Sequence, residues 1–209
     1  VIVVFSSGDD FQRVGLIVVA LLIGAVVGWV FARRVQMTQM PQLVALFNGV
    51  GGGAAALIAL IEFLGRGSTE NKIAVTATVL TVLIGCVSFT GSIVTFLKLQ
   101  ELMTTRPVVF PGGRFVIAAN LIAVLAVSVW VVTALGTTPL LTLGALSLLF
   151  GVLFVLPVGG ADVPIVISLL NAFTGLTVAA SGYVLSSTLL IIAGTLVGAS
   201  GTILTRLMA

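Results

Sequence analysis

Long apolar segments constrain this chain more than any other feature. Seven stretches consist almost only of apolar and small side chains, at 14–32, 41–64, 73–97, 115–135, 139–156, 163–185 and 188–208. About 20 such residues in a helix cross a hydrocarbon core of ~30 Å. Only 7% of the 209 residues are charged, whereas soluble domains carry roughly 25%. The sequence therefore predicts an all-α integral membrane protein, a bundle of seven transmembrane helices in one transmembrane domain over 1–209.

Other readings of the composition are weaker. Strands of a membrane barrel would alternate in polarity over ~10 residues, and no such pattern is present. The net charge of +3 is interpreted as loop charge, so no nucleic-acid partner is expected. The single cysteine, Cys86, lies inside an apolar run and is expected to pack in the core. The opening residues VIVVFSS are too short to span and lack a signal peptide's basic flank, so we expect a fragment of a longer subunit.

Basic residues predict the orientation in the membrane. Three lie on one side, Arg13, Arg66 and Lys72, and six lie on the other, namely Arg33, Arg34, Lys98, Arg106, Arg114 and Arg206. Cytoplasmic loops carry the excess of Lys and Arg. We therefore expect the larger group, and the carboxyl end of the chain, to lie in the cytoplasm.

A proline followed seven residues later by an asparagine occurs twice. Pro41 precedes Asn48, and Pro164 precedes Asn171, in each case at the start of a span. The third span ends in GSIVT and the seventh in GTILT. Spans 1–3 therefore resemble spans 5–7, with the fourth span as a connector. This pattern predicts a parallel internal repeat about an axis along the membrane normal.

Polar side chains inside the spans are the candidates for function, because a buried amide or hydroxyl in lipid must find partners. For Asn48, an interhelical hydrogen bond worth about 0.6–2 kcal/mol and a role in a water path both stay open. Ser168 and Thr174 flank Asn171 at spacings of three, which places a polar stripe on one helix face. Hydroxyls that face this stripe would line a thin water file, and the candidates are Ser88, Thr90 and Ser200.

The sequence lacks the residue types that several kinds of chemistry require. The chain has no histidine, and its charged residues lie in loops or close to helix ends, with Glu62 and Asp162 nearest the membrane. Neither a metal site nor a nucleophile–base pair is indicated. GVGGGAAA matches a nucleotide-binding fingerprint, but it follows no strand. Since a proton relay needs titratable groups at depth, this chain would be at most part of one.

Three functions are compatible with these residues. The first is a proton-conducting subunit of an energy-coupling redox enzyme, for which a narrow file of water molecules between helices is enough. The second is a secondary transporter of a small solute with a polar site at the midplane, which should show discontinuous helices around a substrate-sized cavity. The third is a structural membrane anchor, against which the polar stripe argues weakly. The residues alone rank channel and transporter about equally.

Several blocks carry a resemblance to a known family. VQMTQMPQLVALFNGVGGGAAA, SFTGSIVTFLKLQ, RPVVFPG, GGADVPIVISLLNAFTGL and AGTLVGASGTILT resemble, in order, the membrane domain of the β subunit of proton-translocating nicotinamide nucleotide transhydrogenase. The resemblance implies hydride transfer from NADH to NADP+ while protons cross inward. It implies that NAD(H) and NADP(H) bind soluble partner domains and that no cofactor binds this chain. It favours the channel over the transporter.

The resemblance also implies partners and a place in the cell. An NADP-binding domain would follow the carboxyl end, and α subunits would complete a complex that is a homodimer in the bacterial cytoplasmic membrane. Some family members have a histidine in the third span, where this chain has about Ala74. Others carry it on a membrane helix of the α subunit, and this chain resembles those.

Site residues carry over one at a time. Asn171, in the SLLN block, resembles a residue that lines the channel. Asp162, in the GGAD block, resembles a residue at the cytoplasmic mouth that couples the channel to the NADP domain, and we expect Arg206 to share that role. The GASG block at 198–201 resembles a stretch where helix packing affects coupling.

The charge bias makes the orientation testable. We expect a cysteine placed at Thr105 to react with a membrane-impermeant maleimide only after the membrane is opened, because its loop belongs to the side rich in Arg. A cysteine at Ser68 should react in sealed cells. Labelling of the Thr105 position from outside sealed cells would reverse the orientation.

Overall fold

The computed structural model describes residues 11–66 and 72–209. These residues form seven α-helices, two short 3-10 turns and no strand: α2 (Phe11–Arg34), η1 (Met37–Gln39), α3 (Met40–Arg66), α4 (Lys72–Leu99), α5 (Gly113–Ala134), α6 (Thr137–Val155), η2 (Gly160–Asp162), α7 (Val163–Val184) and α8 (Thr188–Met208). All seven helices are long and apolar enough to cross a membrane. The prediction of an all-helical membrane protein is confirmed, and the predicted span ends differ from the helix ends by at most three residues. The opening segment VIVVFSS and Ser68 lie outside the described residues.

The described helices fall into two compact units. The first contains α2 and η1, and the second begins at Pro41 and contains α3 to α8. The single domain predicted over 1–209 stays a prediction. The internal repeat stays a prediction as well.

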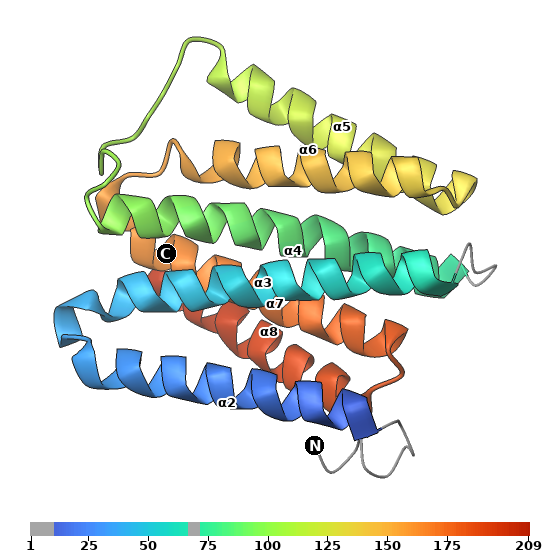
Figure 1. The fold of residues 1–209 in the computed structure, drawn as a ribbon. Coiled ribbons are helices and arrows are strands. Elements are labelled where there is room, and N and C mark those ends of the chain that lie inside the picture. Colours follow the sequence, from blue (N-terminus) through green and yellow to red (C-terminus); the bar gives the residue numbers. More distant parts are fainter. Residues whose placement is uncertain (1–10, 67–71) are drawn as a thin grey trace. The chain divides into compact units, whose positions relative to one another are not determined.

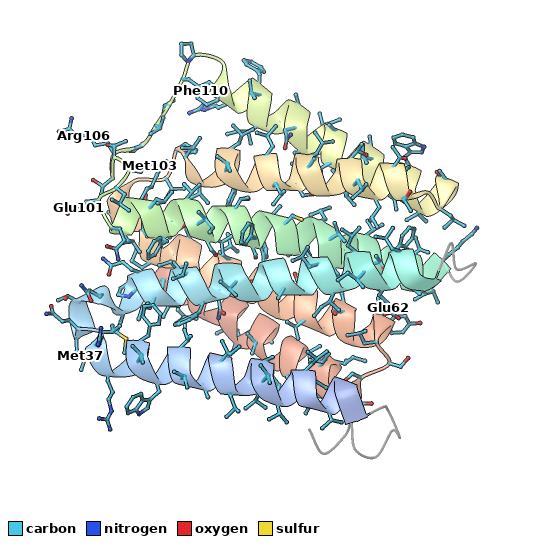
Figure 2. The ribbon with its side chains drawn as sticks, viewed as in Figure 1. Met37, Glu62, Glu101, Met103, Arg106 and Phe110 are labelled. Carbon is cyan, nitrogen blue, oxygen red and sulfur yellow. The ribbon has the colours of Figure 1, made fainter. Side chains whose placement is uncertain are left out.

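Successive helices of the second unit run in opposite directions (Figure 1). The helices α4, α6 and α8 finish at the same end of this unit at which α3, α5 and α7 begin, and we call it the Leu99 end. Figure 2 shows Glu101 and Arg106 at this end and Glu62 at the opposite one.

Local signals explain where the helices begin and end. Pro164 lies in the first turn of α7 and Pro41 in the first turn of α3. N–H groups in a first turn have no acceptor within the helix, so a proline there loses no hydrogen bond. The short link between α5 and α6 turns at Leu135, which has a left-handed φ of 50° and donates its N–H to the carbonyl of Val131. A link this short makes α5 and α6 antiparallel neighbours.

Helix α4 is the centre of the second unit. It packs against α5, α6 and α7, and its glycine Gly85 lies against α3, where an added Cβ would come within 2.7 Å of the carbonyl oxygen of Gly52. Apolar clusters surround it, one of them formed by Val94, Val155, Val166 and Leu170 from α4, α6 and α7. The outward faces of the bundle carry large apolar side chains, as expected for surfaces in contact with lipid.

Glycines bring α7 and α8 to very short separations. A Cβ built on Gly175 would lie 2.5 Å from the backbone nitrogen of Gly198. One built on Gly194 would meet the backbone nitrogen of Ala179 and would lie 2.7 Å from the carbonyl oxygen of Gly175. Small residues at helix contacts allow such approaches in membranes. Gly175, Gly194 and Gly198 therefore allow α7 and α8 to come into close contact.

The close approach of α7 and α8 should be sensitive to a single methyl group. We expect Gly194→Ala to destabilise the fold by about 1–3 kcal/mol, because backbone atoms on α7 have nowhere to move. Gly65→Ala is the matched control, since a Cβ at that position would meet no described atom within 4 Å beyond its own turn of helix. Thermal unfolding of both variants in detergent measures the difference. Equal midpoints would contradict the packing of α7 on α8.

Candidate functional site

Polar side chains on α3, α4, α7 and α8 form a series of contacts from one helix to the next. Three to eleven residues separate them from the helix ends at the Leu99 end, a depth of about 5–17 Å at 1.5 Å per residue. We call this set the polar seam, and its members are Asn48, Ser88, Ser92, Ser168, Thr174 and Thr205.

The first contact of the polar seam joins α3 to α4. The amide nitrogen Nδ2 of Asn48 donates to Oγ of Ser92 at 2.9 Å, and both residues are buried. The amide oxygen Oδ1 of Asn48 is also buried but has no partner among the described residues. Gly49 makes the approach possible, because a Cβ there would lie 3.0 Å from Cβ of Ser92. Asn48 therefore makes an interhelical hydrogen bond, which is one of the two roles left open for it.

The second contact joins α4 to α7 at one backbone carbonyl. The hydroxyl of Ser88 donates to the carbonyl oxygen of Leu170 at 3.1 Å. Thr174 donates to the same oxygen at 3.0 Å. The side chain of Thr174 also lies against α3, where a Cβ on Gly52 would be 3.4 Å from its Oγ1. Three helices thus meet around the carbonyl next to Asn171.

The third contact joins α7 to α8. Thr205 donates its hydroxyl to Oγ of Ser168 at 2.9 Å and also to the carbonyl oxygen of Gly201 at 2.8 Å. Oγ of Ser168 lies 3.4 Å from that same carbonyl oxygen. Each hydroxyl therefore has a partner on its own or the facing helix.

Asn171 is half-buried and makes no side-chain hydrogen bond within the described part of the chain. Its direction follows from helix geometry, because residues three apart are rotated about 60° short of a full turn. Ser168 faces α8 and Thr174 faces α3. Asn171 lies between them, so its amide points to the side of α7 between α3 and α8.

Two expected members of the polar seam lie elsewhere. Thr90 donates to the carbonyl oxygen of Leu148 on α6 at 2.8 Å and to that of Cys86 on its own helix at 3.1 Å, so it faces α6. Ser200 is exposed and donates to the carbonyl of Val197 on its own helix at 3.2 Å. Each lies within one helical turn of a residue that does face α7. A sequence pattern does not decide which of two positions so close together faces a given neighbour.

The two residues expected to couple to a partner domain lie at the Leu99 end. Asp162 is the N-cap residue of α7, is exposed, and makes no side-chain cap hydrogen bond. Arg206 is exposed in the last turn of α8. Both side chains are therefore accessible at the end of the helices where the chain leaves α8.

The sequence reading missed several buried polar groups. Lys98, counted above as a loop charge, is 0% exposed. Gln42 donates from Nε2 to the carbonyl oxygen of Leu99 at 2.9 Å. Asn120 and Ser147, on α5 and α6, are buried with side-chain oxygens that lack a partner in the described residues. A signal for Lys98 was present, because it follows the buried Gly91 and Thr95 at helical spacings of seven and three.

Known proteins match this chain over its length. A family model described as NAD(P) transhydrogenase beta subunit matches residues 1–209. The chain belongs to this family. Two sequences named NAD(P) transhydrogenase subunit beta, both from Rhodospirillum rubrum and one from a defined strain of it, are each 37% identical to it over 204 residues. The resemblance given by the sequence blocks is thereby confirmed.

The aligned region is a much larger share of this chain than of its relatives. It includes 94% of this chain but only 44% of each relative. The chain therefore spans less than half the length of the β subunits that it matches, and more than half of those subunits has no counterpart here.

The competing transporter hypothesis lacks support in the second unit. Each of its described spans is one continuous helix. A groove of about 610 Å³ lies among α3, α4 and α6, but apolar and small residues such as Leu57, Phe89 and Leu141 line it. Neither asparagine of the paired motif lines this groove. The family match and the groove both disfavour a transporter with a polar site at the midplane.

Proposed function

We propose that this chain is the proton-translocating membrane part of an NAD(P) transhydrogenase. In this proposal hydride passes from NADH to NADP+ on soluble domains of the complex, while protons cross the membrane along the polar seam. The nucleotides bind those partner domains, and this chain contributes no nucleotide site. Family membership and the polar seam support the proposal together.

The side chains of the polar seam are of the kinds that hydrogen-bond to water. Hydroxyls and amides both donate and accept hydrogen bonds without changing charge, so they orient water and do not store a proton. The free acceptor Oδ1 of Asn48 and the unpartnered amide of Asn171 are positions where ordered water completes the hydrogen bonding. The observation that carries the proposal is this set of polar groups on four helices, inside a largely apolar bundle.

A group that titrates has to come from a partner. The chain contains no histidine, and a histidine changes charge near neutral pH and responds to small changes in its surroundings. We propose that a membrane helix of the α subunit carries it and packs on the side of α7 between α3 and α8. That side presents the amide of Asn171.

Coupling to the soluble part is proposed at the Leu99 end. Asp162 and Arg206 are exposed there, and α8 ends there at Met208. An NADP-binding domain that continues from α8 would meet both side chains. In this proposal the excess of basic residues at this end supports a cytoplasmic location for it, with the helices in the inner membrane of a bacterial cell and the full complex as a homodimer.

Asn171 is the residue whose loss should separate proton movement from hydride transfer. We expect Asn171→Leu in the full complex to lower proton-coupled turnover by about 100-fold, as loss of a transition-state interaction worth ~3 kcal/mol does. Direct hydride exchange between the soluble domains should continue. Proton pumping and uncoupled exchange are assayed on the same membranes.

Asn120→Leu is the matched control, since Asn120 is a buried asparagine on α5, away from the polar seam. It should pump at the normal rate. Unchanged pumping in Asn171→Leu would remove this residue from the proton path.

Asp162 should matter through its charge. Asp162→Asn keeps the shape of the side chain but removes the negative charge at the start of α7, and we expect coupled turnover in the full complex to fall about tenfold, equivalent to ~1.4 kcal/mol. Glu101→Gln is the control, because Glu101 is an exposed acid at the same end. If both variants turn over normally, Asp162 is only the residue that precedes a helix.

A further inference from the structure

The side chain of Lys98 uses all its donors on one short stretch of backbone. Its ammonium Nζ donates to the carbonyl oxygens of Val155 at 3.0 Å, Leu156 at 2.6 Å and Val158 at 2.8 Å. A lysine ammonium has three N–H groups, so these three bonds complete its hydrogen bonding. No carboxylate forms a salt bridge with it within the described ranges, 11–66 and 72–209.

These carbonyls lie at and just beyond the end of helix α6, where the helix itself supplies no N–H; Val155 accepts instead from the N–H of Val158 at 3.1 Å. Helix α6 ends at Val155, and the last carbonyls of any helix are left without intrahelical bonds. They also carry the negative end of the helix dipole, which a cation stabilises. Pro157 follows directly and has no N–H to donate. Lys98 from α4 thus caps the carboxyl end of α6, and its own surface is fully buried.

The capped stretch leads directly to the start of α7. Five residues after Val155 the chain forms η2 and reaches Asp162, the N-cap residue of α7. The loop after α4 holds the same stretch from its other side. Val108 donates its backbone N–H to the carbonyl of Leu156 at 3.1 Å, and Gly160 donates to that of Thr105 at 2.9 Å. Figure 2 shows Met103 and Arg106 of this loop at that end of the bundle.

We propose that Lys98 is a positioning residue that fixes the connection between α6 and α7, and with it the location of Asp162. Burying an amine between helices is expensive, and every partner of this amine belongs to that connection. The backbone from 155 to 158 is thereby held to the end of α4. The relation to proton coupling rests on the function proposed above for Asp162, whereas the positioning of 156–162 does not.

Hydrogen–deuterium exchange of the intact complex tests the positioning directly. Lys98→Met keeps the length of the side chain and removes its three donors. We expect the amides of 156–162 to exchange roughly tenfold faster or more, as the loss of a bond to a charged group predicts, while amides in the middle of α4 and α7 keep their rates. Lys72→Met is the control, because Lys72 is an exposed lysine at the other end of α4.

A conservative variant separates positioning from a general loss of stability. Lys98→Arg retains a cation with several donors and should restore slow exchange at 156–162. If Lys98→Met does not assemble, Lys98→Gln takes its place, since its shorter amide provides two donors, and it should exchange faster than Lys98→Arg. Unchanged exchange at 156–162 in the Met or Gln variant overturns the proposal, and so does an equal rise in the middle of α4 and α7.

Proton-coupled turnover of the same variants tests the link to Asp162. We expect Lys98→Met to lower coupled turnover as Asp162→Asn does, with hydride exchange between the soluble domains retained. Faster exchange at 156–162 with normal coupled turnover leaves Lys98 as the residue that fixes the connection and removes Asp162 from coupling. The proposal for Lys98 and the proposal for Asp162 are therefore contradicted by different results.

Discussion

Hydrogen bonding without water is the constraint on which the rest of this structure depends. In a hydrocarbon environment an unpaired polar group costs several kcal/mol, so the few polar side chains of these helices must find partners inside the bundle. Lys98 has its three partners on the end of α6. Ser88, Thr174 and Thr205 have theirs on backbone carbonyls or neighbouring hydroxyls. These bonds join α4 to α6 and α7, and α7 to α8, alongside the apolar packing.

The glycines follow from the same requirement. A hydroxyl on one helix reaches a backbone carbonyl on another only if the two backbones come unusually close. Gly52 and Gly85 allow this between α3 and α4, and Gly91 lets α4 approach Leu170 and Val155. Close approach also leaves little space for lipid, so polar groups and glycines occur together. A polar seam in a membrane bundle is therefore inseparable from its small residues.

The sequence predicted the helices well and the faces of their side chains less well. Apolar length decides whether a segment spans, and it is counted over about 20 residues, so errors at single positions have no effect. The direction of one hydroxyl depends on a rotation of about 100° per residue and on which neighbour lies there. Ser88 and Ser168 therefore fell on the expected side, while Thr90 faces α6 and Ser200 faces outward. Lys98 was counted with the loops because a lysine next to a helix end commonly extends to water, and only the arrangement of α4 against α6 shows that it does not.

The contrast between Lys98 and Asn171 suggests how the tasks are divided in this bundle. The cation has a full set of backbone partners and no free direction in which to pass a proton, which suits a fixed structural charge. The asparagine has no partner in the described chain and points between α3 and α8, which suits contact with water or with another helix. A path built from amides and hydroxyls conducts only when something else supplies and removes the proton. In the function proposed above, the polar seam therefore needs a titrating group from outside these residues, and that group would reach the side of α7 that presents Asn171.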